Sequence, residues 1–180
     1  MKERSKILIT ISIPISILFI SLPILAQIFH YRITYQASKS MTKGLYLIRP
    51  AKSFHRNDIA LFRPPIQIRS YMVNAHWIPK NSWMLKKIWG LPGDLVCWEG
   101  NYLQINNKKI RLLKSEIKKH QYLENYLPTL KGCHELQKDQ YLLLSNKVKN
   151  SFDGRYFGPT NKSQILGKAY LFHRIRAQGE

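Results

Sequence analysis

Two patterns of apolar residues divide the chain. Between residues 7 and 29 the sequence carries no charged side chain and consists mainly of Ile, Leu and Phe. A helix of this length would cross the ~30 Å hydrocarbon layer of a bilayer. After residue 31 the apolar residues come in short runs, separated by Pro, Gly, Asn and Asp at close intervals, as in proteins built from many short strands. The pattern therefore predicts one N-terminal transmembrane helix at 7–29, followed by a mainly β domain at 32–180.

Turn residues set the limits of the strands expected in this domain. The expected strands are 45–48, 59–62, 83–89, 95–98, 102–105, 141–144 and 169–172. The strands 95–98 and 102–105 flank Glu99-Gly100-Asn101 and predict a hairpin, and Asn106-Asn107 predicts a second turn. Residues 110–126 mix a few Leu, Ile and Tyr with many Lys and Glu, which predicts a helix or a mobile insertion of unknown purpose.

The N-terminal apolar segment has a competing interpretation as a cleavable secretory signal. Lys2, Arg4 and Lys6 precede it, and Ala26 could stand before a cut. We expect a retained anchor because the apolar run exceeds the ~7 to 15 residues of a signal core, and because Ile24 is a poor match for the small residue that such a cut requires. Basic residues flank the segment on both sides, so charge alone leaves the orientation open.

The chain is strongly basic, with a formal net charge of +19. Such a charge favours contact with anionic lipids or with nucleic acid. The basic residues are spread along the sequence and form no Lys/Arg-rich block with an aromatic stacking pattern, which argues against nucleic acid as a partner. A membrane-tethered basic protein that contacts DNA during transfer, without catalysis, remains the alternative from another functional class.

Three stretches carry possible chemistry. The first places Ser38 and Ser40 two residues apart, ahead of an expected strand; alone it is typical of a solvated loop. The second places Lys86 and Lys87 inside an apolar strand. Adjacent strand residues point to opposite faces, so one lysine can be buried, and desolvation would lower its pKa from ~10.4 towards that of a general base. Alternation does not say which lysine is buried, and an edge strand with two solvated lysines is the plainer reading.

The third stretch is Ser151-Phe152-Asp153-Gly154-Arg155-Tyr156, whose Asp153 and Arg155 can pair on one face of an extended segment. In this order the three stretches resemble the signal peptidase I family of serine proteases, whose pattern is Ser-x-Ser-Met, then Lys before Gly-Leu-Pro-Gly-Asp, then Ser-x-Asp-x-Arg-Tyr. Here the middle motif is Lys86 followed by residues 90–94. The resemblance extends from the apolar segment to about residue 170.

The resemblance implies a role for each of these residues. Ser40 corresponds to the nucleophile and Lys86 to its general base. The Ser38 hydroxyl and the Ser40 backbone N–H correspond to the oxyanion-hole donors. Ser151 would orient Lys86, and two further residues, Asp153 and Arg155, would support that segment. The family works without a cofactor, and its β-rich catalytic module lies at the membrane surface, where it cuts a membrane-tethered precursor after small side chains.

Within the family, the short length, the single anchor and the wording of residues 151–159 look most like the TraF-type peptidases of conjugative transfer systems, which mature a pilin precursor and in some cases are thought to circularise it. General signal peptidases usually carry a Gly-Asp-Asn-Arg-type run where this chain has Ser145-Asn146-Lys147-Val148. A general signal peptidase I for secretory proteins is the alternative. By the same resemblance, the chain would be a single-pass protein of a bacterial inner membrane, with residues 1–6 in the cytoplasm and the peptidase domain on the periplasmic side.

Two further features bear on this interpretation. The cysteines Cys97 and Cys133 are compatible with one disulfide or with two buried thiols; paired cysteines are expected here in the conjugation branch, which favours the disulfide. Thr42 stands where the family generally has proline after Ser-Met, which raises the question of what fixes the backbone beside Ser40. The six histidines fall singly, and no spacing indicates a metal site.

Overall fold

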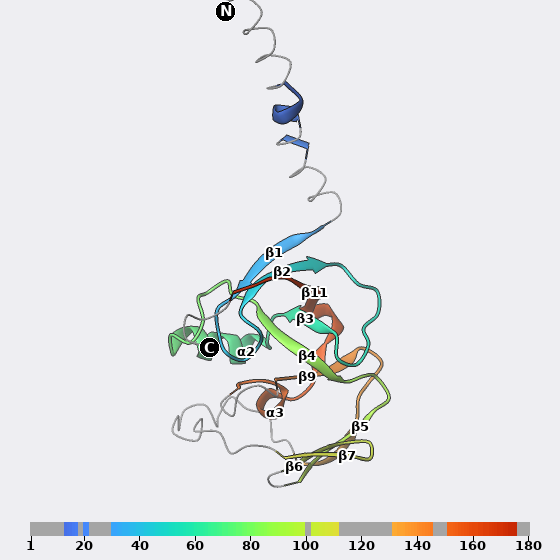
Figure 1. The fold of residues 1–180 in the computed structure, drawn as a ribbon. Helices are drawn as coiled ribbons and strands as arrows, with labels where there is room; N and C mark the ends of the chain where they lie inside the picture. Colours follow the sequence, from blue (N-terminus) through green and yellow to red (C-terminus); the bar gives the residue numbers. More distant parts are fainter. Residues whose placement is uncertain are drawn as a thin grey trace, which may run out of the picture. The chain divides into compact units, whose positions relative to one another are not determined.

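The computed structural model describes residues 13–17, 20–21, 30–99, 102–111, 131–145 and 151–175 (Figure 1). The chain divides into two units, Met1–Arg32 and Ile33–Glu180, which we describe separately. In the first unit, residues 13–17 and 20–21 are helical. Within the described ranges, no helix combines the length and apolar character that crossing a bilayer requires. The rest of the expected span 7–29, and residues 1–6, lie outside the described residues, so the transmembrane helix stays a prediction.

The second unit contains two β-sheets (Figure 1). The larger sheet has seven strands, which in spatial order are β1 (Arg32–Gln36), β2 (Gly44–Arg49), β11 (Ile165–Arg174), β3 (Ile59–Phe62), β4 (Met84–Gly90), β9 (Gln140–Leu144) and β10 (Thr160–Asn161). The smaller sheet has four, in the order β7 (Lys108–Arg111), β6 (Tyr102–Ile105), β5 (Leu95–Glu99) and β8 (Gly132–Glu135). The helices are α2 (Ile66–Asn74), α3 (Gly154–Phe157) and the 3₁₀ turn η2 (Lys162–Gln164). The described domain is therefore mainly β.

Strand β4 lies inside the larger sheet, with antiparallel neighbours β3 and β9. Its residues alternate between two buried clusters. Ile88 packs in a cluster with Phe62 and Phe152. Leu85, on the opposite face, belongs to a second cluster with Met41. Each large apolar side chain that is fully buried contributes roughly 1.5–3 kcal/mol relative to exposure, so both faces of β4 are held firmly.

All seven expected strands are present, and four further strands, β1, β7, β8 and β10, were not predicted. The strands 59–62 and 102–105 have the predicted limits, and the other five are present with shifted ends, β11 being the most extended. The helix α2 was not predicted; it buries only Ile68 and Met72, so it leaves little helical period in the sequence. The expectation of a helix or insertion from residue 110 is wrong for 110 and 111, which belong to β7, and residues 112–130 lie outside the described residues.

The smaller sheet carries a cross-strand disulfide. Cys97 of β5 lies directly opposite Cys133 of β8, and the two sulfurs are bonded. Val96 and Leu103 of the same sheet pack with Leu142 of β9, so the smaller sheet shares a core with the larger one. The disulfide closes a loop with a sequence separation of 36 residues, which on the chain-entropy model is worth about 4 kcal/mol.

Candidate active site

The two serines of the first stretch lie in the loop between β1 and β2. Their hydroxyl oxygens are 2.9 Å apart, in hydrogen-bond contact. Gln36, the last residue of β1, donates from Nε2 to the Ser38 hydroxyl at 2.7 Å and to the Ser38 carbonyl at 3.0 Å. Because the Ser38 oxygen accepts from Gln36, its own proton is available to Ser40 or to a ligand. Sequence reasoning did not identify Gln36, since a glutamine two residues before a serine carries no signal by itself.

Lys86 is the buried lysine of β4. Its residue is only 2% exposed. The partner opposite Lys86 on β3 is Ala60, a small and fully buried residue that leaves room for the lysine stem. The ammonium nitrogen donates to the Ser151 hydroxyl at 2.8 Å, and Ser151 is itself buried. The structure therefore brings Lys86 and Ser151 into direct contact.

Burial lowers the pKa of Lys86 from 10.5 to about 8. The cause is the loss of hydration of the ammonium form inside the domain. The negative charge of Asp153 acts in the opposite direction, and the positive charge of Arg155 adds to the lowering. The effect of burial on the pKa is thus larger than that of the Asp153 carboxylate, and a sizeable fraction of Lys86 is uncharged just above neutral pH.

Asp153 and Arg155 form a buried ion pair. The Arg155 guanidinium donates to both carboxylate oxygens of Asp153, each at 2.7 Å, and Asp153 is fully buried. The same guanidinium donates to the carbonyls of Ser145 and Ser151, at 3.1 and 3.0 Å. A bidentate pair of this kind fixes geometry as well as charge. It therefore ties the end of β9 to the residue that contacts Lys86.

Ser145 connects this network to the serine loop. Its hydroxyl donates to the carbonyl of Ser40, and its backbone N–H donates to Asp153 at 2.9 Å. In the antiparallel register of β4 and β9, Lys87 lies opposite Leu144. Ser145 follows Leu144 at the end of β9, and its carbonyl accepts from the same Arg155 guanidinium that donates to the carbonyl of Ser151. The backbone of Ser40 is thus linked to the partner of Lys86 through Ser145 and Arg155.

Sequence reasoning noted Ser145 only as a departure from the family's usual run and gave it no role. The signal lay in that departure, because a serine in place of the usual glycine adds a hydroxyl. The hydrogen bond from the Ser145 hydroxyl to the Ser40 carbonyl also helps to hold the loop in which Thr42 replaces the family's proline. The carbonyl of Thr42 accepts a hydrogen bond from the Tyr46 hydroxyl at 2.8 Å. Hydrogen bonds on both sides of Met41 therefore hold the loop that lacks the proline.

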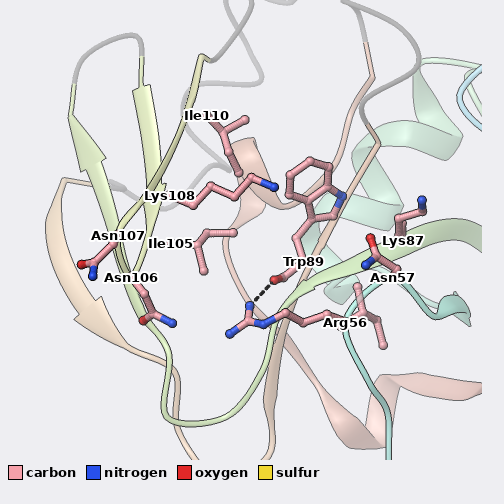
Figure 2. Close-up of a pocket in the computed structure, with 10 residues that line it drawn as sticks. Arg56, Asn57, Lys87, Trp89, Ile105, Asn106, Asn107, Lys108 and Ile110 are labelled. Carbon is pink, nitrogen blue, oxygen red and sulfur yellow. Dashed lines mark hydrogen bonds between the residues drawn. The ribbon is translucent and has the colours of Figure 1, made fainter.

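The Gly-Leu-Pro-Gly-Asp stretch forms the turn after β4. Gly93 has a positive φ of 84°, a conformation that L side chains rarely adopt. Asp94 closes the turn: its carboxylate accepts from the backbone N–H of Leu91 at 2.7 Å and is paired with Arg56. The motif thus fixes the end of the strand that carries Lys86. Lys87, on the other face of β4, lines a separate pocket (Figure 2).

One group of residues has metal-ligand types in proximity. Cys97, Cys133 and Glu99 place their ligand atoms within 4.8 Å of one another. Both sulfurs belong to the disulfide, so they have no thiolate to offer a metal while the bridge is intact.

Comparison with known proteins defines the class. Residues 5–173 match the family model described as signal peptidase, peptidase S26. The chain therefore belongs to this family, a family of serine endopeptidases.

Its relatives fall into two groups by name. Signal peptidase I V of Bacillus subtilis is 27% identical over 122 residues, which cover 64% of each chain. A plasmid transfer protein TraF of Escherichia coli is 28% identical over 138 residues, covering 71% of this chain and 75% of that protein. A solved signal peptidase I from Enterococcus faecalis is 18% identical, with a TM-score of 0.37, and covers 65% of this chain and 97% of that one. The chain spans less than two thirds of the length of the first signal peptidases that it matches, 64% and 46%.

The buried lysine leads to a prediction about stability. The pKa of Lys86 in the folded state, about 8, lies below the ordinary 10.5, so the unfolded chain holds this proton more tightly. The resulting cost to folding is fully present below pH 8, shrinks between pH 8 and 10.5, and vanishes above. Lys86→Met should therefore raise the free energy of unfolding at pH 6 by about 2 kcal/mol, after allowance for the lost hydrogen bond to Ser151.

Urea denaturation at pH 6 and pH 9.5 measures this difference. The gain should be clearly smaller at the higher pH. The control is Lys52→Met, which replaces an exposed lysine and should change stability by less than about 0.5 kcal/mol at either pH. Equal stability of Lys86→Met and the parent chain at both pH values would contradict the burial cost.

Proposed function

We propose that the chain is a membrane-anchored endopeptidase in which Ser40 is the nucleophile and Lys86 its general base. The observation that carries the proposal is the buried Lys86 amine with a pKa lowered to about 8, connected to the Ser40 loop through the hydrogen bonds of Ser151, Arg155 and Ser145. A lysine must lose its own proton before it can accept that of a serine, and with a pKa of about 8 the neutral form of Lys86 is present near neutral pH and becomes the major form above pH 8.

The reaction is an acyl transfer in two steps. The neutral Lys86 amine takes the proton of the Ser40 hydroxyl, whose oxygen attacks the scissile carbonyl carbon of the precursor. The amine of the departing segment then takes that proton and leaves, and the acyl group stays on Ser40 as an ester. Water, activated by the again neutral Lys86, hydrolyses this ester and restores the enzyme.

Ser38 is the proposed oxyanion donor. Its hydroxyl is already oriented by Gln36, which fills the acceptor side of the oxygen and leaves the proton to point at the developing negative charge. Together with the backbone N–H of Ser40, it would stabilise the tetrahedral intermediate; loss of one such donor typically costs about 3 kcal/mol.

Ser151, Asp153 and Arg155 are proposed to position the base rather than to react. Ser151 holds the Lys86 nitrogen at 2.8 Å, and the Asp153–Arg155 pair fixes Ser151 through its carbonyl. Ser145 extends the same network to the carbonyl of Ser40. The nucleophile and the base thus share one hydrogen-bonded frame, which supports their action as a dyad.

For the substrate we propose a membrane-tethered precursor of a conjugative pilin, with small side chains before the cut. The support comes from the plasmid transfer proteins among the relatives: the chain covers 76% and 75% of their lengths, more than it covers of the first signal peptidases. The proposed anchor is the apolar segment 7–29 in a bacterial inner membrane, with the domain on the periplasmic side. An incoming amine in place of water would give a circular product by the same acyl-enzyme.

The first test replaces the proposed dyad. Ser40→Ala and Lys86→Ala should each lower kcat/KM for precursor cleavage by about a thousandfold or more, because neither the nucleophile nor its base can be substituted by solvent. In the parent chain kcat/KM should rise with pH around a midpoint of about 8, as Lys86 loses its proton. Ser53→Ala and Lys52→Ala, at exposed positions, are matched controls. Maturation of the precursor by both dyad variants would exclude the mechanism.

A second test concerns Ser145. Ser145→Ala should lower kcat by about tenfold while KM changes less than about twofold, since the carbonyl of Ser40 loses its donor but no proposed substrate contact is removed. The pH midpoint should stay near 8, because the environment of Lys86 is retained. A drop in melting temperature with unchanged kcat below the melting range would instead assign Ser145 a purely structural role.

A third test distinguishes the two branches of the family. Offered a pilin precursor and an ordinary secretory precursor at equal concentration, the full chain in detergent should cleave the pilin precursor at least about tenfold faster, a difference of about 1.4 kcal/mol in transition-state binding. Mass analysis of the product separates a cut chain from a circular one, which is lighter by one water. Efficient cleavage of the secretory precursor would instead favour a general signal peptidase I.

A further inference from the structure

The pocket lined by Lys87 lies on the face of β4 opposite Lys86. It has a volume of about 600 Å³ and opens between β4 and the β6–β7 hairpin (Figure 2). This volume is in the range of small-molecule sites. Strand alternation separates it from the catalytic side: Lys86 points to one face of β4, and Lys87 and Trp89 point to the other. The proposed function makes no use of this pocket.

Among the described residues that line the pocket, the charged ones are the cations Arg56, Lys87 and Lys108. Asp94 contacts the lining residues Arg56 and Asn106, and its carboxylate also accepts from the backbone N–H of Leu91. Its charge offsets that of Arg56, so the two lysines leave the pocket with a net positive charge. An anion is the ligand that such a lining favours.

The Arg56 guanidinium keeps donors for a ligand. It donates to the Trp89 carbonyl at 2.6 Å and to Asp94, which leaves further N–H groups of its fork available.

The remaining wall is apolar. Trp89, Ile105 and Ile110 line it, and Trp89 and Ile110 pack against the core of the smaller sheet. The Lys108 ammonium lies 5.7 Å from the centre of the Trp89 ring, so a cationic group sits directly over an aromatic surface (Figure 2). An apolar body stacked on the indole could therefore place its charged group near Lys108.

We infer that this pocket binds an anionic phosphate group carried on an apolar body. The cations Arg56 and Lys108 would hold the phosphate oxygens, Lys87 beyond the Trp89 ring would add to the positive charge of the pocket, and Trp89 with the two isoleucines would cover the apolar part. Phosphate suits the lining because its several oxygens can accept from a guanidinium fork and from ammonium groups at once. A lipid head group and a soluble phosphate ester share this chemistry. The inference stands on residues outside the proposed dyad, so it holds or fails separately.

Phenyl phosphate is the direct probe, because it joins a phosphate to a small apolar ring. Titrated into the full chain in uncharged detergent and followed by calorimetry, it should bind about tenfold more tightly than inorganic phosphate, which lacks the ring, or phenol, which lacks the charge. Lys108→Gln and Lys87→Gln should each weaken binding by about fivefold or more. Lys52→Gln, which removes one positive charge outside the pocket, should leave it within twofold.

Competition with vesicles identifies the source of the phosphate. Displacement of phenyl phosphate by vesicles containing phosphatidylglycerol, but not by pure phosphatidylcholine vesicles, supports a lipid head group. Retention of phenyl phosphate against both supports a soluble phosphate ester. Absence of phenyl phosphate binding, or equal affinity in the parent chain, Lys108→Gln and Lys87→Gln, overturns the inference. Precursor cleavage can be measured on the same preparations. A loss of cleavage tests the proposed dyad, and a loss of phenyl phosphate binding tests the pocket, so the two proposals can fail separately.

Discussion

The burial of one amine organises the domain. Lys86 lies almost wholly out of water, and the loss of hydration outweighs the attraction of Asp153, so its pKa falls to about 8. A charge placed there without support would be expelled or would unfold the site. The surrounding residues supply that support: Ala60 makes space, Ser151 accepts the hydrogen bond, and the Asp153–Arg155 pair holds Ser151 in place. The frame that tolerates the lysine is also the frame that reaches the Ser40 loop.

Local pattern was sufficient for most strands but not for their contacts. Short apolar runs between turn residues predicted seven of the strands, because each of these carries a short, mostly apolar run, whereas β1, β7, β8 and β10 were not predicted. The helix α2 left little helical period, since it buries only Ile68 and Met72. Alternation also could not choose between Lys86 and Lys87, because that choice depends on which face of β4 meets Ser151, a long-range contact that no window of sequence contains.

The site also contains residues that the sequence identified and residues that it did not. Ser38, Ser40, Lys86, Ser151, Asp153 and Arg155 were named from a resemblance to a family, and their local contacts could be anticipated from it. Gln36 and Ser145 were not, because neither residue type reveals in the sequence that it will hydrogen-bond to the motif residues, as Gln36 does to Ser38 and Ser145 to Ser40. The pairing of Cys97 with Cys133 also depended on strand register: β5 and β8 set the two residues opposite each other, although 36 positions separate them in the chain.

The two adjacent lysines of β4 have a consequence for how this strand can change over evolution. They serve opposite faces, and the strand is paired on both sides, with Lys86 opposite Ala60 and Lys87 opposite Leu144. A single-residue insertion or deletion within β4 would turn every later side chain to the other face. After a deletion before Lys86, Lys87 would take the position opposite Ala60 that Lys86 now holds, and the side chain of Trp89 would no longer line its pocket. Substitutions can accumulate along β4, but its length is constrained from both faces at once.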